Sequence, residues 1–179
     1  MVVIVLLVPL TALALWAEGR LFSCACGEFQ LWVGDTCSSR NSQQLFDPYS
    51  LTHILHGFLL FWLVGLVFRS LSPAWQLSVA AIFEALWEVV ENTPFIIDRY
   101  RAQTAALGYT GDTIVNSLGD LFCAIVGFVI ARRLGWARSL IAFLLLELVL
   151  LFWIHDGLLL QILMLISPVN VIKSWQMCQ

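Results

Sequence analysis

The sequence has little charge: only 12% of its 179 residues are Asp, Glu, Lys or Arg, where a soluble domain carries about a quarter. Hydrophobic residues make up 60% of the chain and the mean hydropathy is +0.88. This composition is typical of an integral membrane protein and predicts no separate soluble domain. The nine Lys and Arg residues are scattered, which excludes a nucleic-acid interface because phosphate binding needs a dense basic face.

Several motifs of well-understood chemistry are also missing. The chain has no serine-nucleophile elbow, no P-loop and no dinucleotide fingerprint, so acyl-serine, nucleotide and hydride chemistries lose support. It has no internal repeat, low-complexity tract or linker. Residues 1–179 are therefore expected to form a single polytopic membrane domain.

What the sequence does contain is apolar runs. Five of them predict an all-α membrane protein with about five transmembrane helices, over residues 1–17, 51–68, 74–90, 113–131 and 139–154. The first run lacks the charged n-region and the A-x-A site of a signal peptide, so we expect an uncleaved helix. Residues 157–167 are apolar but about half as long as a span, which predicts a short interfacial or re-entrant helix.

Residues 18–50 are polar and predict an extramembrane loop that contains Cys24, Cys26 and Cys37. The C-x-C spacing lacks the paired C-x-x-C of a structural zinc site, so a disulfide is the simpler interpretation. We expect Cys37 to pair with Cys24 or Cys26. Cys123 and Cys178 are expected to be packing residues or free thiols.

The basic residues predict an orientation. Arg132, Arg133 and Arg138 lie in one short loop and Arg69 flanks another. The opposite side holds five basic residues, so the raw count does not decide the orientation: Arg20, Arg40, Arg99, Arg101 and Lys173. We give more weight to the short loops, and by the positive-inside rule their side faces the cytoplasm. We therefore expect a multi-pass protein of the cell inner membrane with the cysteine loop on the periplasmic side, where a disulfide is stable.

Acidic residues occur within the apolar runs, where lipid is expected. Each of two predicted helices carries a polar row on one face, formed by Glu84, Glu88 and Glu91 in the third run and by Asp112, Asn116 and Asp120 in the fourth. An ionised carboxylate in a bilayer costs roughly 2.5 to 3.5 kcal/mol or more. Such a cluster needs protons, cations or a metal to compensate it.

The order of the helices brings further polar residues to the same place. His53 and His56 begin the second run, and His155 and Asp156 end the fifth. In an antiparallel serpentine these ends meet the acidic ends of the third and fourth runs at one membrane face. The convergence therefore follows from the number of spans.

Several strings in the chain also resemble a known family. They are residues 87–101 (WEVVENTPFIIDRYR), 24–27, 41–43, 53–57 and 111–116. Together they resemble a bacterial integral membrane family known only as an uncharacterised domain of unknown function, and the likeness runs over nearly the whole chain. More remotely, the order H-x-x-x-G, E-x-x-x-E and G-D is similar to VanZ-like membrane proteins. The first resemblance implies a membrane class and topology and brings no assigned reaction.

Three hypotheses explain the polar cluster. The first is a metal-dependent hydrolase or transferase that acts on a lipid or cell-envelope substrate at the interface. In it Zn²⁺, Mn²⁺ or iron is bound by His53, His56, Glu88, Glu91 and Asp112. The catalytic residues are Glu84, Glu88 and Asp120, and the substrate-binding residues are Arg99, Arg101 and Asn116. Membrane lipid is the expected partner, and no particular protein partner or oligomeric state is indicated.

The other two hypotheses involve no catalysis. In one, the same side chains form a buried polar network that locks helix packing. In the other, Glu84, Asp120 and Glu147 form a proton or ion pathway. Single residues also have simple explanations, because Asp112 is well placed as an N-cap and the two arginines as interface anchors.

Overall fold

The computed structural model describes residues 2–103 and 108–177, and these residues are organised as helices. Seven helices occur in that part of the chain: α1 (Val2–Ala17), α2 (Ser50–Val67), α3 (Pro73–Glu91), α4 (Pro94–Gln103), α5 (Ile114–Ile154), α6 (Leu158–Ile166) and α7 (Asn170–Gln176). The described residues contain no strand, and extended pairing is limited to one isolated bridge between Trp32 and Phe46. The all-helical expectation is thus confirmed.

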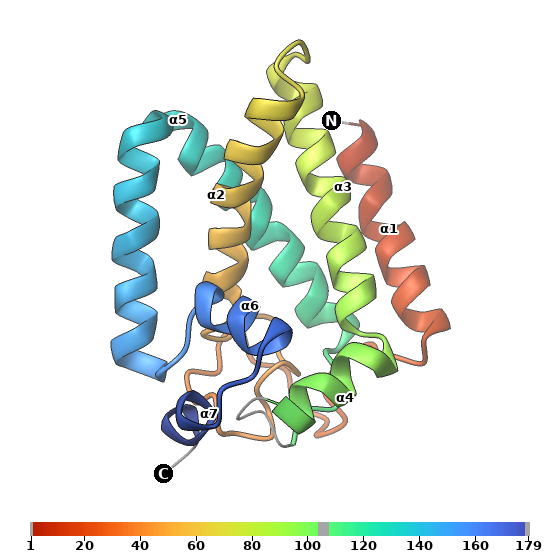
Figure 1. Cartoon of the computed structure of the whole chain (residues 1–179). Coiled ribbons are helices and arrows are strands. Elements are labelled where there is room, and N and C mark those ends of the chain that lie inside the picture. Colours follow the sequence, from red (N-terminus) through yellow and green to blue (C-terminus); the bar gives the residue numbers. More distant parts are fainter. Residues whose placement is uncertain (1, 104–107, 178–179) are drawn as a thin grey trace.

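The long helices run up and down between two poles of the molecule (Figure 1). α2 rises from the lower pole, α3 returns to it, and α5 rises behind them before it bends and descends on the far side. α1 lies outermost, against α3. The lower pole also carries residues 18–49 and α4, α6 and α7, and we call it the polar pole.

The packing of α2 against α5 depends on two glycines. A Cβ atom at Gly57 would lie 2.1 Å from the carbonyl oxygen of Ala124, and one at Gly127 would lie 2.1 Å from that of Ile54. The two backbones therefore touch where small residues allow it, as is common between membrane helices. Beside this crossing, Phe128 is buried in the hydrophobic core.

α5 contains the fourth and fifth predicted helices, which meet at a kink. Its 41 residues are about twice the length that a bilayer core requires. It bends sharply at Gly135, whose φ of 76° and ψ of 174° are open only to glycine. The segment expected to be a loop is thus helical on both sides of a single glycine bend.

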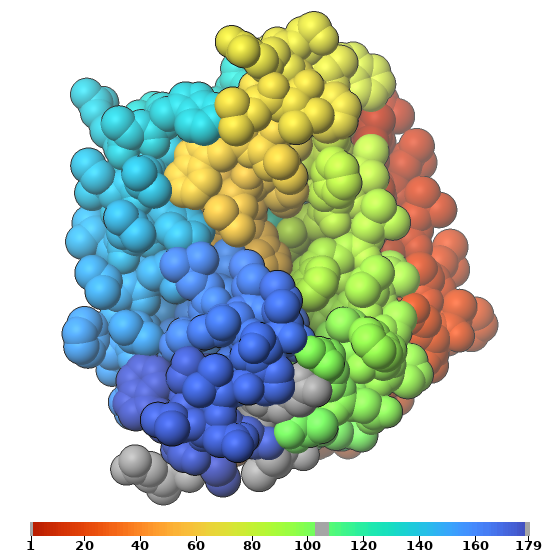
Figure 2. Space-filling model, in the orientation of Figure 1, coloured from red at the N-terminus to blue at the C-terminus, as the bar shows by residue number. Residues whose placement is uncertain are grey.

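A short helix was not expected after the third run. The sequence predicted only a polar turn there, but α4 begins at Pro94 and extends to Gln103. Proline at the first helical position has its φ preset and needs no hydrogen bond for its missing N–H. α4 and α6 lie side by side at the polar pole, and α6 covers the lower end of α2 (Figure 2).

Two helices are long and apolar enough to cross a membrane by length and composition, namely α2 and α5. α1 is apolar but shorter. The number of five spans stays a prediction, as does an interfacial or re-entrant position for α6. The helices themselves occupy the predicted ranges closely.

The predicted disulfide is wrong. Cys24 pairs with Cys26, so Cys37 cannot bond to either. Cys37 is itself disulfide-bonded, and Cys123 is a free thiol. Cys178 lies outside the described residues. Spacing alone did not indicate the pairing, because three cysteines in one loop leave several connectivities open.

Candidate functional site

Two histidines of α2 share one carboxylate of α3. The Nδ1 atoms of His53 and His56 lie 2.7 and 2.9 Å from Oε1 of Glu84. The two rings stack edge to face, with centroids 4.7 Å apart. They lie together because a spacing of three residues places both on the same helical face. Glu84 is only 2% exposed, whereas the side chain of His56 is 17% exposed.

Glu88 lies one turn further along α3 and is fully buried. Its Oε1 is 3.2 Å from Nδ1 of His53, yet neither of its oxygens accepts a hydrogen bond from any described residue. The reason is geometric, because Nδ1 carries at most one proton and that proton points at Glu84. A buried carboxylate without a donor is strongly unfavourable. Glu88 therefore needs a proton or a bound cation.

Glu91 continues the same row toward the polar pole. Its Oε1 accepts a hydrogen bond of 3.0 Å from the hydroxyl of Tyr100, whereas its buried Oε2 has no partner among the described residues. His53, Glu88 and Glu91 place one potential ligand atom each within 4.8 Å of one another, and so do His53, His56 and Glu84. Both groups have the imidazole and carboxylate donors that suit Zn²⁺, Mn²⁺ or iron.

Asp120 reaches the cluster from α5. It is 3% exposed, its Oδ1 accepts a 2.6 Å hydrogen bond from Ser50, and its Oδ2 lies 4.0 Å from Nε2 of His53. Asn116, one turn earlier on α5, is equally buried, and its side-chain nitrogen donates to no described acceptor. Asp120 thus stands behind His53, on the side away from Glu84.

Asp112 is held by a different set of contacts. Its carboxylate accepts from Asn92 at 3.1 Å and from Tyr109 at 3.0 Å, and its backbone N–H donates to Asn92 at 2.7 Å. Burial raises the pKa of Asp112 to about 6. It belongs to neither ligand group. It is also not the N-cap of α5, because Thr113 accepts the capping hydrogen bond from Asn116.

The two arginines predicted to bind substrate are engaged elsewhere. Arg99 donates to the backbone carbonyls of Leu165 and Ile166 at the C-terminal end of α6. Arg101 donates to the carbonyl of Tyr109. Both side chains therefore tie segments of the polar pole together, and neither lines the cavity described next.

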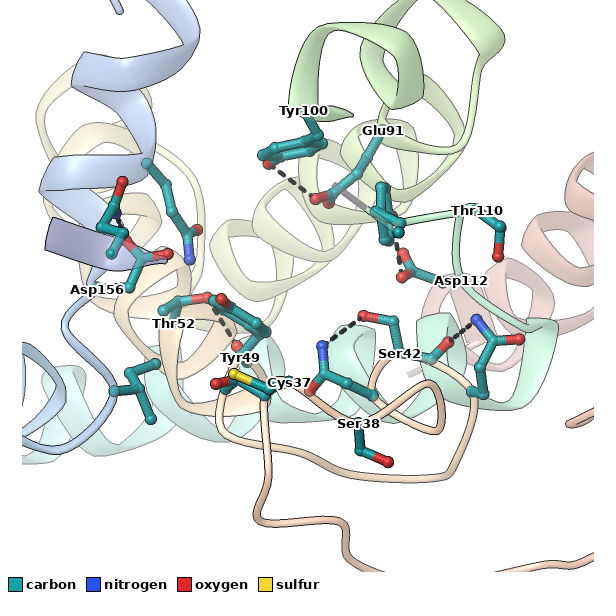
Figure 3. Close-up of a pocket in the computed structure, with 18 of the residues that line it drawn as sticks. Cys37, Ser38, Ser42, Tyr49, Thr52, Glu91, Tyr100, Thr110, Asp112 and Asp156 are labelled. Carbon is teal, nitrogen blue, oxygen red and sulfur yellow. Dashed lines mark hydrogen bonds between the residues drawn. The ribbon is translucent and has the colours of Figure 1, made fainter. Parts of the chain in front are cut away.

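A cavity of about 480 Å³ opens at the polar pole beside the cluster (Figure 3). His53, Glu91 and Asp120 lie in its wall, so the cavity reaches the cluster directly. Its other lining residues come from the cysteine loop, from α4 and the segment after it, and from the C-terminal helices. The main ones are Tyr49, Thr52, Tyr100, Tyr109, Asp112 and Asp156.

Sequence reasoning missed the tyrosines and did not assign Asp156 to the site. Burial raises the pKa of Asp156 to about 6, against hydrogen bonds from Gly157, Gln161, Tyr49 and Gln176 that lower it. Burial also raises the pKa of Tyr49 well above its usual value, and the nearby Asp156 adds to the shift. The available signal was the position of His155-Asp156 at a helix end on the same pole.

The sequence is similar to proteins from several bacteria. It is 42% identical to a UPF0314 protein of Brucella anthropi over 162 residues, which is 90% of this chain and 82% of that protein. It is 40% identical over 171 residues to one of Paracoccus denitrificans, with 96% and 89% covered. A third, UPF0314 protein R03235 of Rhizobium meliloti, is 44% identical over 158 residues, with 88% and 80% covered.

No solved structure matches the fold. The remoter likeness to VanZ-like proteins stays a prediction. The family model described as "Protein of unknown function (DUF2585)" matches residues 3–178. With nearly the whole chain matched, and with the resemblance predicted from residues 87–101 confirmed, the protein belongs to the DUF2585 family.

Proposed function

We propose that the protein is a multi-pass inner-membrane enzyme that uses a divalent metal to hydrolyse or transfer a lipid or cell-envelope substrate. The observation that carries this proposal is the carboxylate of Glu88, which is fully buried, 3.2 Å from His53 and without a hydrogen-bond donor among the described residues. A cation is the simplest group that stabilises it in its ionised form.

The residues present fit a metal. His53, His56 and Glu84 place one potential ligand atom each within 4.8 Å of one another, and Oε1 of Glu88 lies 3.2 Å from Nδ1 of His53. A cation bound at Nδ1 of either histidine would displace any proton from that atom, because a ligating imidazole must be deprotonated at the bonding atom. Zn²⁺, Mn²⁺ and iron all accept such a ligand set, and a bound metal would polarise an oxygen of the substrate or of water.

Other residues would orient this centre. A metal bound at Nδ1 of His53 would leave the proton of that imidazole on Nε2, which faces Oδ2 of Asp120 at 4.0 Å, and Ser50 holds Asp120 in turn. A carboxylate behind a ligating histidine fixes its tautomer and orientation. Glu91 lines the cavity and has a free Oε2. It is the residue best placed to take a proton from an attacking water or hydroxyl and pass it to the leaving group.

The outer surface supports a membrane location. Only 17% of the apolar window of α5 is buried within the protein. Its second arm exposes Leu140, Ile141, Leu145, Val149 and Phe152, each at least half exposed. A soluble protein rarely exposes apolar surface of this extent. The four arginines at the pole opposite the cavity favour a cytoplasmic position for that end and a periplasmic one for the polar pole.

Elemental analysis of the detergent-purified protein tests the proposal. We expect about one metal ion per chain, and about a tenth of that or less in Glu88→Gln. Glu147→Gln is the matched control: it neutralises another carboxylate of an apolar helix, one that accepts a hydrogen bond from the Leu159 N–H. If Glu88→Gln fails to fold, His56→Gln serves in its place. A metal-free wild type, or variants that retain the metal, would contradict the proposal.

The same samples separate the two alternatives. A purely structural network predicts that no metal is bound. It also predicts that Glu88→Gln lowers the free energy of unfolding by about 3 to 5 kcal/mol and so reduces the amount of folded protein. A proton pathway also predicts that no metal is bound. In that case Glu84→Gln and Asp120→Asn should impair function as much as Glu88→Gln, and the histidine changes should have mild effects.

A further inference from the structure

We infer that the cavity at the polar pole binds an organic ammonium group, either the head of an amine-bearing lipid or a soluble amine. This inference deepens the proposed function by naming the class of substrate. It rests on the proposed function for the reaction only, because the wall that would bind the ammonium group is separate from His56, Glu84 and Glu88.

The wall contains three tyrosine–carboxylate pairs. Tyr100 donates to Glu91 and Tyr109 donates to Asp112, each at 3.0 Å, and the hydroxyl of Tyr49 pairs with Asp156. Tyr49, Tyr100, Glu91, Asp112 and Asp156 approach the cavity from different sides (Figure 3). Aromatic faces combined with carboxylates are the usual recognition surface for substituted ammonium ions.

The tyrosines are held in defined positions. Tyr100 and Tyr109 stack edge to face with centroids 5.5 Å apart. Each phenolic oxygen is bonded to an acid, which fixes where the ring lies, and the contact between Tyr100 and Tyr109 restricts the rotation of those two rings. A pre-oriented aromatic wall lowers the entropic cost of binding.

The charge of the wall favours a cation over an anion. Four carboxylates line the cavity, and no lysine or arginine among the described residues does so. The basic side chains of this pole are already engaged. Their acceptors are the carbonyls of Thr110 for Arg20, Tyr109 for Arg101, Leu165 and Ile166 for Arg99, and Ala102 for Lys173, and Arg40 pairs with Glu28. A phosphate or carboxylate would find none of the forked donors that recognise it elsewhere.

Buried polar atoms in the wall lack partners, which points independently to a ligand. Oε2 of Glu91, Oδ1 of Asn41 and Oε1 of Gln176 are buried and accept no hydrogen bond from a described residue. All three residues line the cavity. Its volume of about 480 Å³ suits a small organic group and exceeds what a single ion needs.

Calorimetric titration of the detergent-purified full chain tests the inference. Choline and ethanolamine are expected to bind, whereas glycerol and inorganic phosphate are not. Asp156→Asn and Tyr100→Leu should each weaken choline binding about tenfold. Asp98→Asn is the matched control, because Asp98 is an exposed acid of the same pole that does not line the cavity. The inference would be overturned if the wild-type protein bound neither amine. It would also be overturned if Asp98→Asn weakened choline binding as much as Asp156→Asn.

Two further arms separate the sources and the two proposals. If short-chain phosphatidylcholine binds more tightly than both choline and short-chain phosphatidylglycerol, the ligand is a lipid head group. If choline binds with the same affinity as the lipid, the ligand is a soluble amine. Glu88→Gln should lose metal and keep choline binding. Choline binding without metal in the wild type would sink only the metal proposal, and metal without choline binding would sink only this inference.

Discussion

A fully buried carboxylate requires a donor, a proton or a cation, and Glu88 has no donor within the described part of the chain. The periodicity of α3 predicted that it would share a face with Glu84 and Glu91, and α2 brings His53 against that face. The pairing of both imidazoles with Glu84 was not predictable, because it depends on the rotation of α2 about its axis. Glu84, predicted as a catalytic group, is therefore proposed as a ligand.

Asp156 shows what the sequence leaves open at the residue scale. Its contacts come from Tyr49, Gln161 and Gln176, residues that no periodicity connects to it. Only the return of the C-terminal helices over the polar pole brings them together. The cavity, in contrast to the cluster, was therefore missed.

The raised pKa of Asp156 predicts a pH dependence of stability. The folded value is about 6 and the unfolded one about 3.9, so between these values the folded state binds more protons and stability falls as the pH rises. The penalty is complete above about pH 6. Thermal unfolding should show that Asp156→Asn is more stable than the wild type at pH 7, by at most about 3 kcal/mol. The stability of this variant should also fall less than that of the wild type between pH 4.5 and 7. An unchanged decline would refute the assignment, and Asp98→Asn should retain it.

At the scale of the elements, the apolar runs located the helices but not their joints. α4 was missed because its charged sequence has no apolar stripe long enough to signal a helix. The bend in α5 was predicted as a loop because three arginines surround Gly135. Only Gly135 leaves the helical conformation, so the helix resumes directly after the kink.

The glycine crossing of α2 and α5 yields a prediction of its own. Gly57→Ala or Gly127→Ala should destabilise the protein by about 1 to 3 kcal/mol, because the new methyl group would overlap a backbone carbonyl. Gly65→Ala, on the same helix, meets nothing nearer than a Trp136 carbon at 3.6 Å. It should be neutral or stabilising, since alanine is the better helix former. Equal melting temperatures for the three variants in detergent would show that this crossing is not tight.

At the scale of the whole molecule, the serpentine order of the helices and the meeting of their polar ends were predictable from hydropathy alone. The structure places His53, Glu91 and Asp112 at the polar pole as that order requires. The disulfide was not predictable, because its connectivity depends on the path of the cysteine loop and not on spacing.

The proposed orientation, with the polar pole in the periplasm, rests on the arginines near the bend of α5 and is testable in intact cells. A membrane-impermeant thiol reagent should reach a cysteine placed at Asp98 near the polar pole and should not reach one placed at Ala137 beside the bend of α5. Both positions are exposed in the structure. The unmodified protein gives the background from the free thiol of Cys123. Labelling of the cysteine at Ala137 and not of the one at Asp98 would show that the protein has the opposite orientation.

X-ray absorption at the edge of the metal bound to purified wild-type protein would show whether His53, His56, Glu84 and Glu88 hold a metal. We predict a first shell of nitrogen and oxygen at about 2.0 to 2.2 Å with the outer-shell scattering of two imidazoles. The metal edge itself should fall to about a tenth or less in His53→Ala and in His56→Gln. A sulfur-containing shell, or a wild-type spectrum without imidazole, would show that these four residues do not form the site.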